Sequence, residues 1–159
     1  MKGQIFILGA LAITLAFFFA IPKFQQQIYL PDLDLSQLEN IAKQYNKWIA
    51  YASIESYNIL DFGEVVKDNY PNLEFVYLLS ENQALKIVNF FDYNLSVTIN
   101  GENLTLKPFS YEQTNFQEEI NFTSNFVNFS YKPNHTYSGA IFLRINKGIT
   151  ELTLLKIFK

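Results

Sequence analysis

Residues 95–106, LSVTINGENLTL, carry the clearest local fold signal in the chain. The Asn-Gly dipeptide at 100–101 separates two runs of alternating polar and apolar residues and is typical of a two-residue type I′ β-hairpin. The turn sets a register in which Val97 faces Leu104, so one face of the hairpin is apolar and the other polar. The full predicted pairing is Thr98 with Asn103, Val97 with Leu104, Ser96 with Thr105 and Leu95 with Leu106.

The same period-two pattern extends from Leu73 to the end of the sequence, with turn signals between short apolar runs. We expect further strands over residues 74–79, 85–91, 116–123, 126–131, 137–146 and 149–158. Roughly seven or eight strands without crossover helices favour an antiparallel β-sandwich over a parallel sheet. The predicted head is therefore Ig-like in architecture.

Two helices are predicted before these strands. Ser36 to Glu39 reads as a capping box, and apolar residues then recur at helical spacing through Ala52. A second, shorter helix is expected between Ile59 and Tyr70, closed by the Pro-containing stretch 69–72. The apolar stripe fits packing against the chain's own β domain or a seam against other subunits, and we interpret the region as a helical stalk and collar.

The N-terminus contains an uncharged run, IFILGALAITLAFFFAI at residues 5–21. As a helix extended by its flanking residues, this run is long enough to span a bilayer, with Lys2 and Lys23 reaching the two interfaces. A plain uncleaved anchor is one reading. A secretory signal peptide is another, although it would place Phe18 and Ala20 at the −3 and −1 positions before the cleavage site.

A third reading uses the residues in front of the apolar run. Lys2-Gly3-Gln4 resembles the class III leader of archaeal type IV pilin-like proteins, in which a leader peptidase cuts between Gly and Gln. The resemblance implies processing at Gly3 and Gln4, retention of the apolar helix, and association with other pilin-like subunits through it. Many members carry Glu at the fifth mature position, where this chain has Leu8, and this difference favours a minor pilin or a pilin-like surface protein.

The predicted fold class is thus α+β, with an N-terminal transmembrane helix and helical stalk followed by an antiparallel β-sandwich head. The expected boundaries are a leader at 1–3, a transmembrane helix at 4–24, a stalk at 25–71 and a head at 72–159. In this topology the N-terminus is cytoplasmic and the head lies outside the membrane, either singly or in a surface filament.

Five Asn-x-Ser/Thr sequons cluster in the predicted head, where about two would be expected by chance in the whole chain. Strand alternation places their asparagines on polar faces or in a loop, so that glycans would not disturb a core. The candidate glycosylation sites are Asn94, Asn103, Asn121, Asn128 and Asn134. Ordinary use of Asn, Ser and Thr on exposed β surfaces is the competing explanation.

Composition narrows the function further. The net charge of −3 and the pI near 5.1 disfavour nucleic-acid binding, and the absence of cysteine excludes disulfides and thiolate chemistry. Neither the single histidine, His135, nor the adjacent pair Glu118 and Glu119 suggests a catalytic site, and Asp32 with Asp34 lacks the further ligands of a calcium loop. We predict no enzyme activity, catalytic residue, metal or cofactor.

These observations predict a membrane-anchored, extracytoplasmic pilin-like subunit, with other subunits, the membrane and a leader peptidase as its partners. The alternative is a permanently anchored surface binding module or adhesin that does not polymerise. The sequence does not identify a surface ligand for either.

Overall fold

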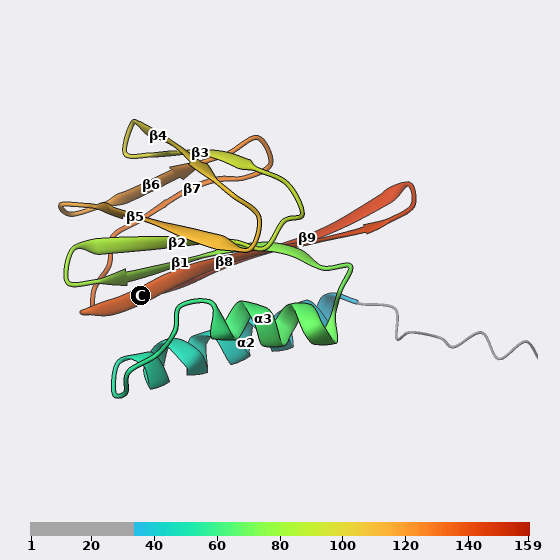
Figure 1. Cartoon of the computed structure of the whole chain (residues 1–159), viewed down its shortest axis with the longest axis horizontal. Coiled ribbons are helices and arrows are strands. Elements are labelled where there is room, and N and C mark those ends of the chain that lie inside the picture. Colours follow the sequence, from blue (N-terminus) through green and yellow to red (C-terminus); the bar gives the residue numbers. More distant parts are fainter. Residues whose placement is uncertain (1–33) are drawn as a thin grey trace, which may run out of the picture. The chain divides into compact units, whose positions relative to one another are not determined.

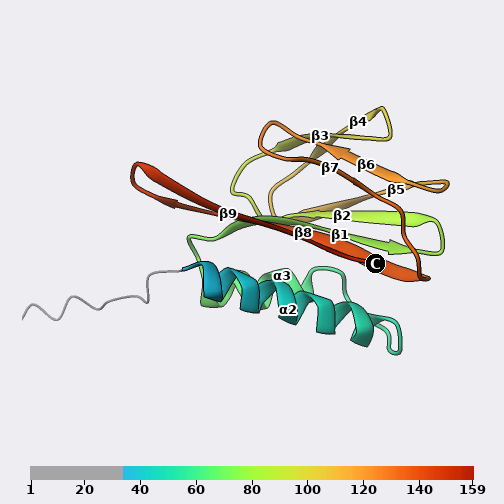
Figure 2. The same cartoon turned by 180° about the vertical axis from the view of Figure 1, so that it is seen from behind.

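Two helices and two antiparallel sheets make up the part of the chain that the computed structural model describes, residues 34–159. Helices α2 (Leu35–Ala52) and α3 (Asp61–Asn69) lie against one face of a five-stranded sheet, and a four-stranded sheet lies against its other face (Figures 1 and 2). The described residues therefore form three layers, with the five-stranded sheet in the middle.

The middle sheet has the order β5-β2-β1-β8-β9 and the outer sheet the order β4-β3-β6-β7. All neighbouring strands are antiparallel. The strands are β1 (Glu74–Glu81), β2 (Ala84–Asn89), β3 (Leu95–Ile99), β4 (Glu102–Leu106), β5 (Ser110–Asn115), β6 (Ile120–Thr123), β7 (Asn128–Tyr131), β8 (Tyr137–Lys147) and β9 (Thr150–Phe158).

The central strand β1 explains why there are three layers. All its residues from Phe75 to Ser80 are buried, on both faces of the sheet. Phe75 and Tyr77 point into a core shared with the helices, whereas Val76 and Leu78 point into a second core shared with the outer sheet. Because alternate residues of a strand face opposite sides, a continuous apolar strand needs a cover on each side.

The predicted helical stalk is wrong. The apolar stripe of α2 is buried against the middle sheet, and Leu38, Ala42 and Tyr45 each keep 1% or less of their surface exposed. α2 contacts β8 and β9. This packing confirms the alternative that the stripe lies against the chain's own β domain. Without the helices, the apolar helix-side face of the sheet would be exposed to solvent.

The start of α2 also differs from the prediction. Asp34 is the N-cap, its carboxylate accepts from the Gln37 amide at 2.9 Å, and the Gln37 side chain accepts from the Asp34 amide at 3.2 Å. Ser36 lies inside the first turn and donates to Asp34 at 2.6 Å. The capping box is thus shifted by two residues from Ser36 and Glu39, because the Asp34 carboxylate also fits the cap position.

The hairpin of residues 95–106 has the predicted register in every pair. The strands expected at 74–79, 85–91, 137–146 and 149–158 are confirmed as β1, β2, β8 and β9, with small shifts of boundary. β6 and β7 cover only the last parts of the predicted strands 116–123 and 126–131. Strand β5 was not predicted, because its sequence SYEQTN is polar and pairing with β2 alone holds it in the sheet.

The predicted fold class is wrong in its helical part: residues 34–159 form two antiparallel sheets, which is compatible with a β-sandwich, but their two helices cover a sheet and do not form a stalk. No helix among these residues is long and apolar enough to cross a membrane. The Ig-like expectation also fails, since the helix layer and these strand orders differ from the ABED and CFG sheets of an immunoglobulin domain. The predicted leader at 1–3, the transmembrane segment at 4–24, and Gly3 and Gln4 lie outside the described residues.

Candidate functional site

The outward-facing side of the outer sheet is uncharged and polar, and we call it the polar face. Its strand residues alternate with the buried residues of the second core, so they point away from the middle sheet. Every side chain in the set is an amide or a hydroxyl. The polar face consists of Ser96, Thr98, Asn103, Thr105, Asn121, Thr123, Asn128 and Ser130.

Strand register aligns some of these side chains in a row across all four strands. Thr98 pairs with Asn103 on one side and with Thr123 on the other, and Thr123 pairs with Asn128. The Thr98 hydroxyl donates to Asn103 Oδ1 at 2.7 Å, and the Thr123 hydroxyl donates to Asn128 Oδ1 at 3.3 Å. These bonds engage the side-chain oxygens of Asn103 and Asn128 and not their nitrogens.

All five sequon asparagines are exposed. Asn103, Asn121 and Asn128 lie on the polar face, Asn94 directly precedes β3, and Asn134 lies in the loop between β7 and β8. Within a strand, the spacing of a sequon puts the asparagine and its hydroxyl residue on the same face. The sequon positions are therefore accessible to solvent; three of them lie on the polar face, and a fourth directly precedes a strand of the same sheet.

A groove lies at the end of the two sheets where three connections meet, and we call it the loop groove. It has a volume of about 1080 Å³. The turns β1–β2 and β3–β4 and the segment between β5 and β6 form its walls. Its lining residues are Asn82, Gln83, Ile99, Asn100, Gly101, Glu102, Asn115, Phe116, Gln117, Glu118, Glu119 and Asn121.

Hydrogen bonds hold the three walls together. Asn100 donates through Nδ2 to the Glu119 carbonyl at 3.0 Å and accepts at Oδ1 from the Asn121 amide at 2.8 Å. The Phe116 amide donates to the Gln83 carbonyl at 3.0 Å. These loops are therefore tied to one another.

The charge of the loop groove limits what it can bind. Its only charged lining residues are Glu102, Glu118 and Glu119. Glu118 is paired with Lys132 at 3.0 Å outside the lining, and the hydrogen bond from Lys132 lowers the pKa of the Glu118 carboxyl. An anionic ligand would be repelled here, whereas amide side chains suit neutral hydroxylated ligands.

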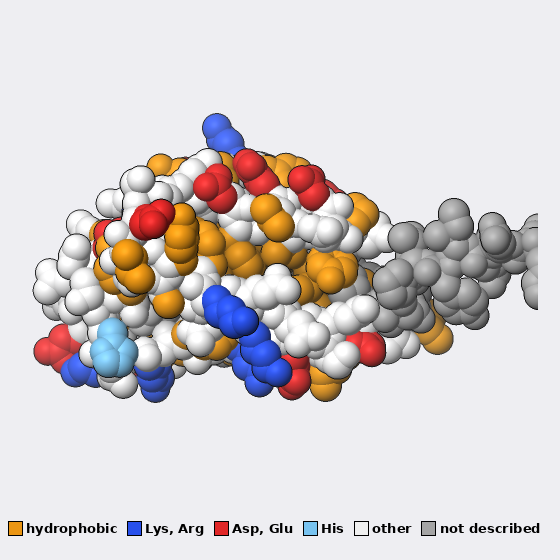
Figure 3. Space-filling model, turned by 90° about the horizontal axis from the view of Figure 1, so that it is seen from below, with side chains coloured by type: hydrophobic (Ala, Val, Ile, Leu, Met, Phe, Trp, Pro, Cys, Tyr) orange, Lys and Arg blue, Asp and Glu red, His pale blue; other side chains and the backbone are white. Residues whose placement is uncertain are grey.

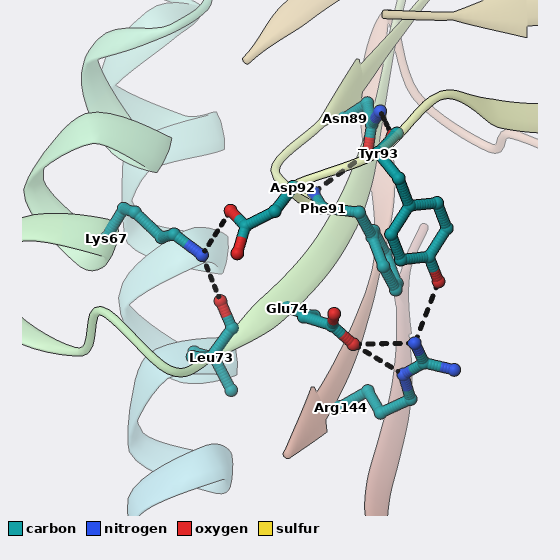
Figure 4. A network of polar contacts seen from close by, with 8 residues as sticks. All are labelled: Lys67, Leu73, Glu74, Asn89, Phe91, Asp92, Tyr93 and Arg144. Atoms are coloured by element: carbon teal, nitrogen blue, oxygen red, sulfur yellow. Dashed lines mark hydrogen bonds and ion pairs between the residues drawn. The ribbon is translucent and has the colours of Figure 1, made fainter. Parts of the chain in front are cut away.

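The ion pair between Arg144 and Glu74 is structural. Arg144 of β8 donates to Glu74 Oε2 from Nε at 2.8 Å and from Nη2 at 2.6 Å, and it also donates to the Tyr93 hydroxyl at 2.8 Å (Figure 4). Its guanidinium lies over the rings of Phe91 and Phe126, 5.0 and 5.5 Å from their centroids. With Nε and Nη2 engaged and its guanidinium packed against two aromatic rings, Arg144 has a structural role.

Two further residues labelled in Figure 4, Lys67 and Asn89, connect the layers. Lys67 of α3 donates to the Leu73 carbonyl and pairs with Asp92, each at 3.2 Å. Asn89 of β2 is fully buried; its Nδ2 donates to the carbonyls of Tyr93 and Lys107 at 3.0 Å, and its Oδ1 accepts from the Phe91 amide. These residues hold the middle sheet to the helices and to the loops of the outer sheet.

Within residues 34–159, neither the other residues considered from the sequence as ligands or catalytic groups nor the helix surface forms a reactive site. His135 is exposed in a loop, Asp34 caps α2, and Asp32 lies outside the described residues. No group of acidic or histidine side chains within residues 34–159 is arranged to hold a metal ion. On the helix side, a row of acidic side chains lies near the upper edge of the view and most basic side chains lie in its lower half, with apolar side chains between them (Figure 3).

The chain has no match among protein-family models, curated proteins or solved structures. Sequence reasoning identified the sequons but missed the loop groove, whose residues come from three separate turns. The sequence Asn82-Gln83 gave little indication of the turn between β1 and β2. In the structure both residues have positive φ, at 50° and 67°.

Proposed function

We propose that the chain is a non-enzymatic, pilin-like subunit of a cell-surface filament, anchored by its apolar N-terminal sequence, with its β domain outside the membrane and glycosylated. The observation that carries this proposal is the exposure of all five sequon asparagines, three of them on the uncharged polar face. A glycan is attached to an accessible Asn side chain on a solvent-facing surface. The polar face is such a surface, and its side chains are uncharged. The Lys2-Gly3-Gln4 motif supports the pilin-like part.

The first experiment is the N-terminal residue and intact mass of the protein purified from its native membrane. A mature chain starting at Gln4 with excess mass supports the proposal, and electron microscopy of the cell surface then tests for filaments. A chain starting at Met1 contradicts processing by a prepilin-type peptidase. A chain starting near Ile21 makes the apolar run a signal peptide and contradicts the anchor.

Glycosylation is tested with closely matched asparagines. Asn121 is in the sequence Asn-Phe-Thr, whereas exposed Asn115 and Asn125 are in Asn-Phe-Gln and Asn-Phe-Val. Asn121→Gln is expected to remove the mass of one glycan, and Asn115→Gln and Asn125→Gln are expected to remove none. Equal masses in all three variants, after correction for the substitution, contradict modification at Asn121.

A second function is favoured by the loop groove. In this alternative the chain is a permanently anchored binding module whose groove holds a neutral or cationic polyhydroxylated ligand, such as a cell-surface saccharide. It predicts an intact N-terminus and saccharide binding that is weakened by Gln117→Ala and unaffected by Thr105→Ala on the polar face. Loss of binding in both variants, or in neither, contradicts a site in the groove.

A further inference from the structure

Strand β9 is the longest of the four edge strands in the two described sheets. It has nine residues, whereas β5, β4 and β7 have six, five and four. Among the strands of residues 34–159, its only neighbour is β8. An edge strand presents a row of backbone donors and acceptors that can pair with another chain, and natural proteins usually shorten, bend or cover such edges.

Within residues 34–159, β9 has little of this protection. Its sequence, TELTLLKIF, contains no proline, and no residue within it has a positive φ of the kind found in glycine bulges. α2 contacts β9 through the face of the sheet, where Leu152, Leu154 and Phe158 pack against the helix core. β5, the opposite edge of the sheet, lies beside β4 and is less open.

The β8–β9 turn determines which backbone groups of β9 face outward. Lys147 pairs with Thr150 across a two-residue turn, Gly148-Ile149, with Gly148 at φ 64°. In a two-residue hairpin the pair that flanks the turn is hydrogen-bonded, so the amides of even-numbered β9 residues point to β8. The amides of Glu151, Thr153, Leu155 and Ile157 therefore point away from the sheet.

Two copies can join at this edge as antiparallel strands around a two-fold axis that is perpendicular to the sheet. Such an axis keeps each face of the sheet on the same side, so that paired residues must both be even or both be odd. The possible registers place Thr153, Leu154, Leu155 or Lys156 opposite its own copy.

The Leu155-centred register gives the best side-chain pairs. It sets Glu151 opposite Lys159, Leu152 opposite Phe158, Thr153 opposite Ile157 and Leu154 opposite Lys156, and each pair occurs twice by symmetry. A register centred on Lys156 puts two like charges together, and those centred on Thr153 or Leu154 put Glu151 opposite an apolar residue. Opposite charges and apolar pairs directly across strands are favourable, whereas like charges are not.

We propose that β9 is a self-association edge at which a second copy of this chain adds its own β9, antiparallel and centred on Leu155, to make one continuous sheet. The occupant is a second copy because Glu151 with Lys159, and Leu152 with Phe158, complement each other in that register. This inference is independent of membrane anchoring, glycosylation and leader cleavage.

Single cysteines read the register directly, because the chain contains no cysteine of its own. In a hydrogen-bonded antiparallel pair the Cα atoms are about 5.5 Å apart, which a disulfide spans. The variants are Thr153→Cys, Leu154→Cys and Leu155→Cys in the full chain, oxidised in detergent micelles and separated on non-reducing gels. Thr105→Cys on the polar face is the control for collisional cross-linking.

Leu155→Cys is expected to form dimers at least about tenfold faster than Thr105→Cys, because pairing raises the local thiol concentration. Two Thr153→Cys copies would be about 14 Å apart and should react at the control rate. Faster dimer formation by Thr153→Cys or Leu154→Cys overturns the proposed register. Control rates at all three positions overturn self-association at β9.

A second measurement does not depend on replacing the partly buried Leu155. Glu151→Cys and Lys159→Cys alter exposed side chains, and the proposal predicts mixed disulfides between these two variants at a rate well above that of either variant alone. Control rates in the mixture contradict the pairing. If the mixture reacts at the control rate and the cysteine of Glu151→Cys is nevertheless protected from a maleimide in native membranes, a different protein covers the edge. That outcome overturns the proposal.

Discussion

Buried tyrosines show how individual polar groups are accommodated in the two cores. Tyr45 of α2 donates its hydroxyl to the Leu78 carbonyl at 2.7 Å, and Tyr77 donates to the Ile59 carbonyl. Tyr131 is also buried but makes no hydrogen bond within the described part of the chain; the nearby hydroxyls of Ser80 and Ser138 bond each other at 2.6 Å. Burial raises the pKa of the Tyr131 hydroxyl above its ordinary value, and the two nearby serine hydroxyls partly oppose this rise.

The tyrosines should therefore differ in their response to loss of the hydroxyl. We expect Tyr45→Phe to lower the free energy of unfolding by about 1–3 kcal/mol, because it leaves a buried carbonyl without its donor. Tyr131→Phe should change it by less than about 0.5 kcal/mol or raise it, since no bond is lost. Urea denaturation of both variants measures the difference, and equal losses would contradict the assigned roles.

A pH dependence follows from Glu81 at the end of β1. Its carboxylate accepts from Tyr137 at 2.7 Å, from Tyr57 at 2.9 Å and from Lys86 at 3.1 Å. The Tyr137 hydrogen bond contributes most to lowering the pKa of Glu81, and Lys86 and Tyr57 add to it against the opposing effect of burial. A carboxyl whose pKa is lower in the folded state stabilises the fold above its unfolded pKa.

We expect this stabilisation to be present at neutral pH, to decline below the ordinary carboxyl pKa of 4.5 and to vanish below the lowered folded value. The difference in unfolding free energy between the wild type and Glu81→Gln should therefore shrink as the pH falls through this window. Glu118→Gln is the control, because the Glu118–Lys132 pair is exposed and screened by solvent. A difference that is constant from pH 7 to pH 3 would exclude the linkage.

At the scale of elements, close helix–sheet packing depends on glycine. A Cβ on Gly63 of α3 would lie 1.9 Å from the Phe90 ring, and one on Gly139 of β8 would lie 2.6 Å from the Leu78 carbonyl oxygen. Phe90 cannot move away easily, since it is buried and stacked on Phe75 with ring centroids 4.9 Å apart. These two glycines let the helices approach the sheet.

Gly63→Ala tests packing against helix propensity. Alanine favours an isolated helix by about 1 kcal/mol over glycine, yet we expect this variant to be destabilised by about 1–3 kcal/mol through overpacking. Val65→Ala, on the exposed side of the same helix, should change stability by less than about 0.5 kcal/mol. Thermal and urea unfolding give both values. A more stable Gly63→Ala protein would contradict the close contact with Phe90.

At the scale of the whole molecule, the helix layer is part of the folded domain. The helix-side core contains Phe75, Tyr77 and Leu79 of the central strand, and each is fully buried. Removing α2 and α3 would expose this apolar surface to water, which carries a cost of about 25 cal/mol per Å².

We therefore expect residues 72–159, expressed alone, to be unfolded or aggregated, whereas residues 34–159 fold cooperatively. Circular dichroism and hydrogen exchange of the two fragments make the comparison. A stable, well-protected fragment 72–159 would show that the sheets fold without the helices and would restore the view of a separate head.

The sequence by itself determined the hairpin of residues 95–106, most other strands, the two helices and the exposure of the sequon asparagines. These features depend on local periodicity and turn chemistry, which neighbouring residues specify. Only the tertiary structure decided that the helices cover a sheet, that polar β5 is a strand, that three turns form a groove and that β9 lies at an edge of the sheet described for residues 34–159. Each of these depends on contacts between residues distant in the sequence, and the free energy of burying both faces of β1 decides the layer order.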